Sequence, residues 1–171
     1  MHARRTAIAL VALALALSGC AKRATPAASH GSPSASPPAV SFPVTLTDDD
    51  GVVLTMKAAP QRIVTWGPSN TEILFALGVG DRVIGVSGPF DDYPPQARGI
   101  VHVGDASGVQ PNAEKVVSLH PDLVLNAFLG GDQWKARLRG LGIPVFSIYA
   151  TNLDDALHDI GTVGHDSGCA Q

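Results

Sequence analysis

The chain contains only two cysteines, Cys20 and Cys169, among its 171 residues. Two cysteines cannot build the multiple-disulfide framework that holds many small secreted domains together. The pattern around Cys20 predicts that its sulfur carries a lipid, which leaves Cys169 without a partner in the chain. No disulfide is therefore expected.

The sequence also lacks a cluster of basic residues. Its 12 Lys and Arg are outnumbered by 15 Asp and Glu, and the formal net charge is -3 at pH 7 with the six histidines neutral. Nucleic acids and anionic lipid surfaces attract proteins with dense positive charge. Neither is expected as a partner.

Signatures of the common enzyme and metal classes are missing as well. No glycine-rich phosphate motif follows a predicted strand, and no nucleophile elbow or metal-hydrolase motif is present. Asp91 and Asp92 are adjacent on an extended stretch, where their side chains point apart and are badly placed for paired catalysis. His158 and His165 lie seven residues apart, outside any paired Cys/His zinc spacing. We expect no enzymatic activity, intrinsic cofactor or metal site; a zinc- or manganese-binding protein stays open as an alternative.

The N-terminus has the pattern of a bacterial lipoprotein signal. Two arginines precede an apolar run over residues 7–17, and Ser18 and Gly19 lead to Cys20. A membrane span takes roughly 20 apolar residues to cross ~30 Å of hydrocarbon, so this run is too short. The pattern predicts a signal peptide over residues 1–19 and lipidation of Cys20. It places the protein on the extracytoplasmic face of the cell membrane; an ordinary secretory signal is the alternative.

Residues 20–43 are dominated by Ala, Ser, Pro and Gly. Such a segment has too little large apolar surface to offset the entropy lost on ordering, so we predict a disordered tether. A tether lets a folded domain stand away from the bilayer while staying close to a membrane partner. The globular part that follows is long enough for one modest core but too short for two full domains.

The globular part opens with two alternating runs, 44–47 and 52–56, separated by Asp48-Asp49-Asp50-Gly51. An Asp-Gly pair between such runs predicts a β-hairpin. After Pro60, short β-branched runs alternate with helical stretches. Strands are predicted over 63–66, 83–86, 123–125 and 145–148, and helices over 72–77, 113–119, 133–139 and from about 153. This alternation predicts an α/β fold with a mainly parallel sheet flanked by helices, a single Rossmann-like lobe preceded by a hairpin.

Ligands of such sheets gather at the carboxyl ends of the strands. Loops 67–72, 88–95, 104–110 and 126–131 are predicted to lie there. Ser69 and Glu72 of the first loop also have capping-box spacing, which is the alternative reason for their presence. Aromatic rings on loops are costly to expose unless something covers them.

Five aromatic residues are candidates for ligand binding or for packing. Phe90 and Phe128 are expected to contact a ligand, whereas Tyr93 is expected to pack in the protein. Trp66, at a strand end, faces either the core or the crevice. Trp134 is expected to pack.

Seven stretches in succession carry a family resemblance: residues 60–64, 68–78, 83–86, 92–97, 103–104, 112–117 and 121–125. Together they resemble metal-chelate substrate-binding proteins, the periplasmic components of ABC importers for cobalamin, haem and ferric siderophores. The resemblance spans Pro60 to about Gly164, and it implies a monomeric solute receptor that delivers its ligand to an ABC permease without chemistry.

The resemblance also suggests which ligand is bound. The stretches Ser69-Asn70-Thr71-Glu72 and Asp92-Tyr93-Pro94-Pro95 resemble the vitamin B12-binding branch, which makes cobalamin or a related corrinoid the leading ligand. Loop 104–110 lacks the aromatic residue that cobalamin binders usually have there, so a ferric siderophore or haem is the alternative. The ligand-binding residues that we predict are Trp66, Pro68, Ser69, Asn70, Phe90, Asp91, Asp105 and Phe128.

The resemblance implies further features of the complete binding protein. A glutamate at the position of Glu114 docks on arginines of the permease; the alternative is that a carboxylate in a first helical turn only complements the helix dipole. Family members have two lobes joined by a long helix, and this chain matches one lobe. Residues 44–164 are therefore predicted to be the N-terminal lobe and 165–171 the truncated start of the inter-lobe helix. A lobe that serves only as a protein-interaction surface is the remaining alternative.

Overall fold

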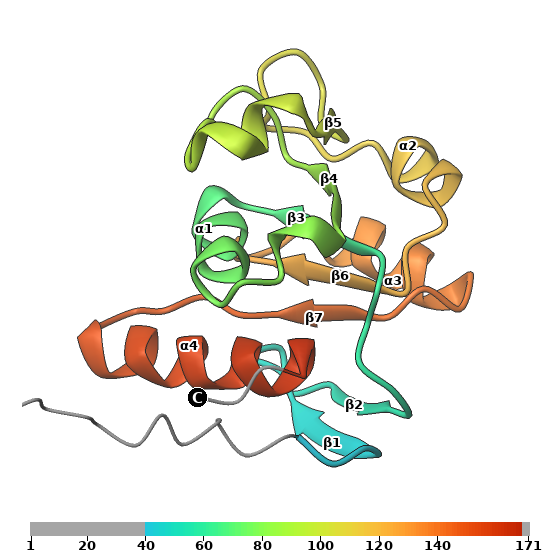
Figure 1. Cartoon of the computed structure of the whole chain (residues 1–171). Coiled ribbons are helices and arrows are strands. Elements are labelled where there is room, and N and C mark those ends of the chain that lie inside the picture. Colours follow the sequence, from blue (N-terminus) through green and yellow to red (C-terminus); the bar gives the residue numbers. More distant parts are fainter. Residues whose placement is uncertain (1–39, 169–171) are drawn as a thin grey trace, which may run out of the picture. The chain divides into compact units, whose positions relative to one another are not determined.

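A five-stranded, all-parallel sheet forms the centre of the part of the chain that the computed structural model describes, residues 40–168 (Figure 1). Cys20, Cys169 and the predicted signal peptide lie outside the described residues. The strands are β3 (Ile63–Trp66), β4 (Val83–Val86), β5 (Val101–His102), β6 (Leu123–Asn126) and β7 (Val145–Ser147). Helices flank this sheet, which confirms the predicted α/β fold.

The strands lie side by side in the order β5-β4-β3-β6-β7. The chain therefore runs outward from β3 to β5 and then returns to place β6 against the other side of β3. Trp66 and Asn126, the last residues of β3 and β6, are register partners. In sheets of this type, the crevice where the strand order reverses is the usual ligand site.

Helices cover both faces of the sheet, two on each face (Figure 1). The helices α1 (Pro68–Ala76) and α4 (Leu153–Ser167) pack on one face through Leu74 and Val163. The helices α2 (Ala113–Ser118) and α3 (Asp132–Gly140) pack on the other through Val116 and Leu138. Two short 3-10 helices, η1 (Gly80–Arg82) and η2 (Pro95–Gly99), lie in the connections next to β4 and β5.

Side-chain alternation along the strands divides the apolar residues into two cores. Ile63 of β3 packs in the core under α1 and α4, whereas Val64 and Trp66 pack in the core under α2 and α3. Trp66 therefore belongs to the α2–α3 side of the sheet and stands at its carboxyl edge. The sheet thus presents an aromatic side chain at the strand-order reversal.

The predicted hairpin is confirmed as β1 (Val44–Thr47) and β2 (Val53–Met56), which pair antiparallel. Gly51 has a φ of 76° in the turn, which suits glycine. Met56 is buried in the core under α1 and α4. The hairpin is therefore attached to the lobe by apolar contacts.

Two local features differ from the sequence predictions. The capping box between Ser69 and Glu72 is absent: α1 begins at Pro68, and its N-cap residue is Gly67, with no side-chain capping bond. Proline at the first helical position sets the start of the helix without a capping side chain. The two-residue strand β5 was not predicted, because both of its residues are exposed and carry no buried pattern.

Among residues 40–168, no helix combines the length and the apolar character needed to cross a bilayer.

Candidate functional site

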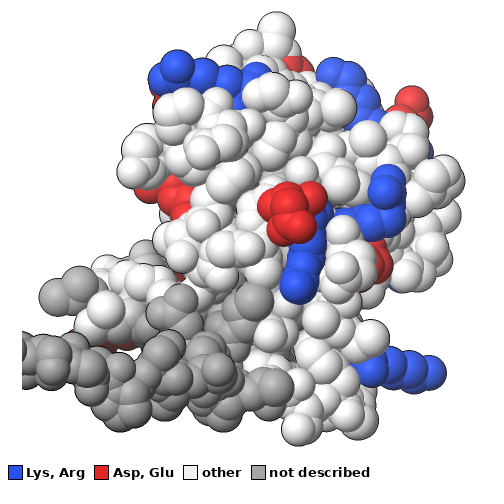
Figure 2. Space-filling model, viewed as in Figure 1, with Lys and Arg blue, Asp and Glu red and all other residues white. Residues whose placement is uncertain are grey.

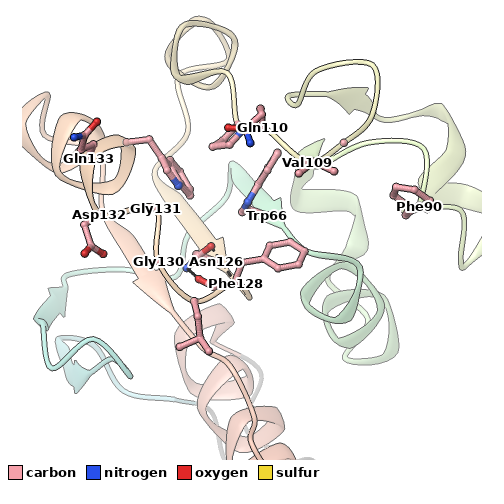
Figure 3. A pocket seen from close by; sticks show the side chains of 14 residues that line it. Trp66, Phe90, Val109, Gln110, Asn126, Phe128, Gly130, Gly131, Asp132 and Gln133 are labelled. Atoms are coloured by element: carbon pink, nitrogen blue, oxygen red, sulfur yellow. Dashed lines mark hydrogen bonds between the residues drawn. The ribbon is translucent and has the colours of Figure 1, made fainter.

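A hollow of about 940 Å³ lies at the carboxyl edge of the sheet, where β3 and β6 end (Figure 3). Its volume falls within the range of small-molecule sites, roughly 300–1,000 Å³. Four segments of the chain contribute to it, three of them loops that follow β4, β5 and β6. The lining residues are Trp66, Phe90, residues 108–111, Asn126 and residues 128–134.

Three aromatic rings form a connected group in the hollow. Trp66 is only 4% exposed. Its ring lies edge-on to those of Phe128 and Trp134, with centroid distances of 6.3 Å and 6.0 Å. Edge-to-face pairs of this kind stabilise by about 0.5–1.5 kcal/mol beyond their burial. Trp66 therefore belongs to the core and to the hollow at once, and Trp134, which was expected only to pack, also lines the hollow.

The outer part of the hollow exposes large apolar side chains. The exposed fractions are 67% for Phe90, 64% for Val109, 47% for Phe128 and 75% for Leu129. Figure 3 shows Phe90 well apart from Phe128, so the two phenyl rings lie at separate places in the hollow. A group of exposed apolar side chains around a concavity is typical of a binding surface.

Asn126 holds the loop that carries Phe128. Its side chain is 1% exposed; Nδ2 donates to the Phe128 carbonyl at 2.8 Å, and Oδ1 accepts from the Phe128 backbone N–H at 3.3 Å (Figure 3). Nδ2 also donates to Oγ of Ser147 at 3.2 Å. Asn126 is not among the ligand-binding residues predicted from the sequence, although it begins loop 126–131, which was predicted to lie at the carboxyl edge of the sheet.

Two predicted ligand-binding carboxylates brace loops instead of lining the hollow. Asp91 is 2% exposed and accepts hydrogen bonds from the Thr71 and Ser87 hydroxyls and from the Gly88 backbone N–H. It fixes the loop that carries Phe90. Asp105 closes its own loop in the same way.

Asp105 accepts from the Ser107 hydroxyl at 2.7 Å and from the Val109 backbone N–H at 3.1 Å. The hydrogen bond from Ser107, followed by those from the backbone, lowers the pKa of Asp105 below its ordinary value. Short carboxylate side chains favour such local turns. The turn places Val109 in the hollow.

The start of α1 lies outside the lining of the hollow. Pro68 is half-buried, Ser69 is exposed and Asn70 is 1% exposed. Within residues 40–168, Nδ2 of Asn70 has no hydrogen-bond partner.

Tyr93, which was expected to pack, is 64% exposed, so that prediction was wrong.

A second depression of about 550 Å³ adjoins the hollow, and the two share Gln110, Pro111, Gln133 and Trp134. Glu114, in the first turn of α2, lines this depression and has an 84% exposed side chain. Its carboxylate lies 3.7 Å from Arg137 of α3. An ion pair this exposed contributes little stability, and the Glu114 carboxylate is accessible to solvent.

Charge is dispersed on the face that Figure 2 shows. Lys and Arg side chains and Asp and Glu side chains lie there in small groups of both signs, separated by uncharged surface. In the part of the chain that the structure describes, no group of three or more His, Cys, Asp or Glu side chains is arranged to hold a metal ion. The hollow itself combines aromatic and aliphatic walls with a few polar groups, Gln110, Asp132 and Gln133 among them.

Known proteins match most of the chain. Residues 63–170 match the family described as periplasmic binding protein. The chain is 39% identical over 132 residues to an uncharacterized ABC transporter substrate-binding lipoprotein of Bacillus subtilis, and 39% identical over 134 residues to a cobalamin-binding protein of Halobacterium salinarum. These matches cover 74% and 77% of the chain but 40% and 36% of the relatives, so the chain spans about two fifths of their length.

Solved structures agree with these sequence matches. The periplasmic vitamin B12 binding protein BtuF of Vibrio cholerae has a TM-score of 0.57 and 33% identity, with 63% of this chain and 42% of that chain covered. An Fe3+-hydroxamate transport system protein of Saccharomonospora viridis has a TM-score of 0.58 and 30% identity, with 74% of this chain and 49% of that chain covered.

Proposed function

Because the chain belongs to the periplasmic binding protein family, we propose that it is a solute-binding component of an ABC importer that takes a metal chelate into the hollow at the ends of β3 and β6. The observation that carries this proposal is the exposed apolar rim around a buried tryptophan. Exposure of Phe90, Phe128 and Leu129 to water is unfavourable, and a bound ligand would cover them. The protein binds and releases its solute unchanged.

Cobalamin or a related corrinoid is the ligand that we propose first. The similarity to the cobalamin-binding protein of Halobacterium salinarum and to the vitamin B12 binding protein of Vibrio cholerae supports this choice. The corrin ring is a large, mostly apolar surface with amide side chains at its edge. Aromatic rings such as Trp66 and Phe128 suit the ring, while Gln110 and Gln133 can hydrogen-bond to the amides.

A ferric hydroxamate siderophore is the second candidate. Two observations favour it: the similarity to the hydroxamate transport protein of Saccharomonospora viridis, and the absence of an aromatic residue from loop 104–110. This loop contributes Val109 and Gln110 to the hollow, a smaller and more polar wall than an aromatic ring provides. Such a wall is compatible with a compact ligand.

Delivery to a permease completes the proposal. Lipidation of Cys20 would hold the protein at the extracytoplasmic face of the membrane, in keeping with the lipoprotein among its relatives. Glu114 would then meet an arginine of the permease, because its carboxylate is exposed and already pairs weakly with Arg137. Loss of such a rim contact changes mainly the rate of association with the transporter.

Calorimetric titration of the full chain with cyanocobalamin, a ferric hydroxamate siderophore and haemin, in parallel, tests the proposed function. Saturable binding of one chelate supports the proposal and names the solute. The described residues enclose a ligand from one side, so we expect weaker binding than a two-walled clamp gives. A folded chain that binds none of the three would contradict the proposal for the chain as it stands.

A further inference from the structure

The acidic turn of the hairpin lies against β7 and α3, far from it in sequence. The carboxylate of Asp50 accepts three hydrogen bonds there: from the Ser147 hydroxyl at 2.6 Å, from the Lys135 ammonium at 2.7 Å and from the Tyr149 hydroxyl at 2.5 Å. Burial by itself raises the pKa of Asp50, but the bonds from Lys135, Ser147 and Tyr149 outweigh it and lower the pKa to about 2. Asp50 is therefore an anion at physiological pH.

The hydrogen bond between Ser147 and Asp50 is connected to the Phe128 loop through further hydrogen bonds whose donors and acceptors are fixed. Ser147 is completely buried, and its hydroxyl has one proton, which it gives to Asp50. Its oxygen is then left to accept, and it accepts from Nδ2 of Asn126 at 3.2 Å. This sets the orientation of the Asn126 amide, which in turn donates to and accepts from the backbone of Phe128.

The second contact reaches α3. Lys135 is 1% exposed, and its ammonium group bridges Asp50 and Asp132, the latter at 3.2 Å. A buried ammonium group is strongly unfavourable without an anion beside it. Lys135 directly follows Trp134, whose ring packs on Trp66, so the position of Asp50 also fixes the turn of α3 that lines the hollow.

We propose that Asp50 is a positioning residue for the hollow: through Ser147 and Asn126 it holds Phe128, and through Lys135 it holds Trp134. Asp50 itself does not line the hollow. The effect on ligand affinity rests on the proposed function, whereas the effect on Phe128 and Trp134 does not.

Docking of the hairpin does not depend on Asp50 alone, so its positioning role can be separated from docking. Asp48 is buried and accepts from the Arg139 guanidinium at 2.9 Å and from the Ser147 backbone N–H at 3.2 Å. Asp49 accepts from the Tyr149 backbone N–H at 2.8 Å. None of these bonds uses the Asp50 carboxylate or the Ser147 hydroxyl, so we expect them to remain when either group is changed.

Ser147→Ala in the full chain tests the proposal, because it interrupts the path to Asn126 and leaves the ion pair of Asp50 with Lys135 in place. The matched control is Ser167→Ala, which also removes a buried serine hydroxyl; this hydroxyl donates only to the Gly164 carbonyl, at the far end of α4. The chain has two tryptophans, Trp66 and Trp134, and both line the hollow. Acrylamide quenching of tryptophan fluorescence therefore reports on the hollow and on the depression that shares Trp134 with it.

The expected result is stronger quenching in Ser147→Ala than in wild type, with Ser167→Ala unchanged. The affinity for whichever chelate binds should fall by roughly threefold to tenfold in Ser147→Ala, the usual effect of one buried hydrogen bond. Asp50→Asn is the second variant, used if Ser147→Ala unfolds, and should increase quenching further because Lys135 also loses its anion. Quenching of both variants equal to wild type would overturn the proposal.

The two proposals can fail independently. If the wild-type chain binds no chelate but Ser147→Ala is still quenched more strongly, the proposed function fails and Asp50 still positions the hollow. If a chelate binds equally well to wild type and Ser147→Ala, with equal quenching, the positioning role fails and the proposed function stands.

Discussion

Trp66 and Asn126 are register partners at the ends of two neighbouring parallel strands, β3 and β6. The strand order reverses between these strands: α1, which follows β3, packs on one face of the sheet and α3, which follows β6, packs on the other, and a concavity lies at the strand ends. Trp66 supplies its aromatic floor, and Asn126 holds the backbone of Phe128 beside it. The pair therefore links the topology of the sheet directly to the wall of the candidate site.

Trp66→Ala is expected to destabilise the fold far more than Phe128→Ala. Trp66 is 4% exposed and Phe128 is 47% exposed. Removal of a buried tryptophan leaves a cavity and costs about 3–5 kcal/mol, whereas the half-exposed phenylalanine contributes about 1 kcal/mol. Urea unfolding of both variants measures the difference. Equal losses of unfolding free energy would show that Phe128 belongs to the core.

Gly67→Ala is expected to disturb the Phe128 loop. Gly67 has a φ of 127°, and a Cβ there would lie 2.5 Å from Cβ of Ala127, the residue before Phe128. We expect a loss of about 1–3 kcal/mol in unfolding free energy together with weaker ligand binding. Gly99→Ala is the control, since a Cβ at Gly99 meets nothing within 4 Å. A fully stable Gly67→Ala variant would show that the loop yields without cost.

Acid should weaken the contact of the hairpin with α3. The pKa of Asp50 is lowered from 3.8 to about 2 in the folded protein, so its contribution to stability is complete above about pH 4 and is lost as the pH falls toward 2. Asp50→Asn should therefore flatten the dependence of unfolding free energy on pH in this range. Urea unfolding at several pH values between 2 and 5 measures it, with the exposed Asp81→Asn as control. Parallel pH profiles for Asp50→Asn and wild type would contradict the assignment.

Lys135 and Arg137 should differ sharply on substitution by methionine, although both lie on α3 and pair with carboxylates. Lys135 is 1% exposed and pairs with Asp50 at 2.7 Å, whereas Arg137 is 59% exposed and pairs with Glu114 at 3.7 Å. Lys135→Met leaves Asp50 without its nearest cation and should cost about 2–4 kcal/mol. Arg137→Met should change the unfolding free energy by less than about 1 kcal/mol. Thermal unfolding of the two variants separates these cases; similar melting temperatures would contradict the structural role of Lys135.

The sequence predicted the fold better than the details of the site, for a physical reason. Apolar periodicity and the Asp-Gly turn are local signals, and they placed the hairpin and four of the five parallel strands. Phe90 and Phe128 could be selected from the sequence because aromatic rings on strand-end loops are costly to expose unless something covers them. Both rings line the hollow. One of the loop-bracing bonds of Asp91 comes from Thr71, 20 residues away, and no local pattern indicates that contact.

Long-range contacts also explain why three residues in or behind the site were not predicted from the sequence to have these roles. Asn126 lines the hollow because β6 returns to the side of β3, and the order of the strands is not visible in the sequence. The sequence predicts Asp50 only as a turn residue, yet its carboxylate accepts a hydrogen bond from Ser147, 97 residues further along the chain. The sequence predicts that Trp134 packs, and in the structure it packs on Trp66 and also lines the hollow.

Calorimetric titration of a Phe90→Ala/Phe128→Ala double variant, with the chelate that wild type binds, tests most directly whether this hollow is the binding site. Leu141→Ala is the matched control, since Leu141 is 59% exposed and does not line the hollow. We predict at least about tenfold weaker binding by the double variant, from the loss of two aromatic contacts, and unchanged binding by the control. Equal affinity of the folded double variant and wild type would contradict ligand binding in this hollow.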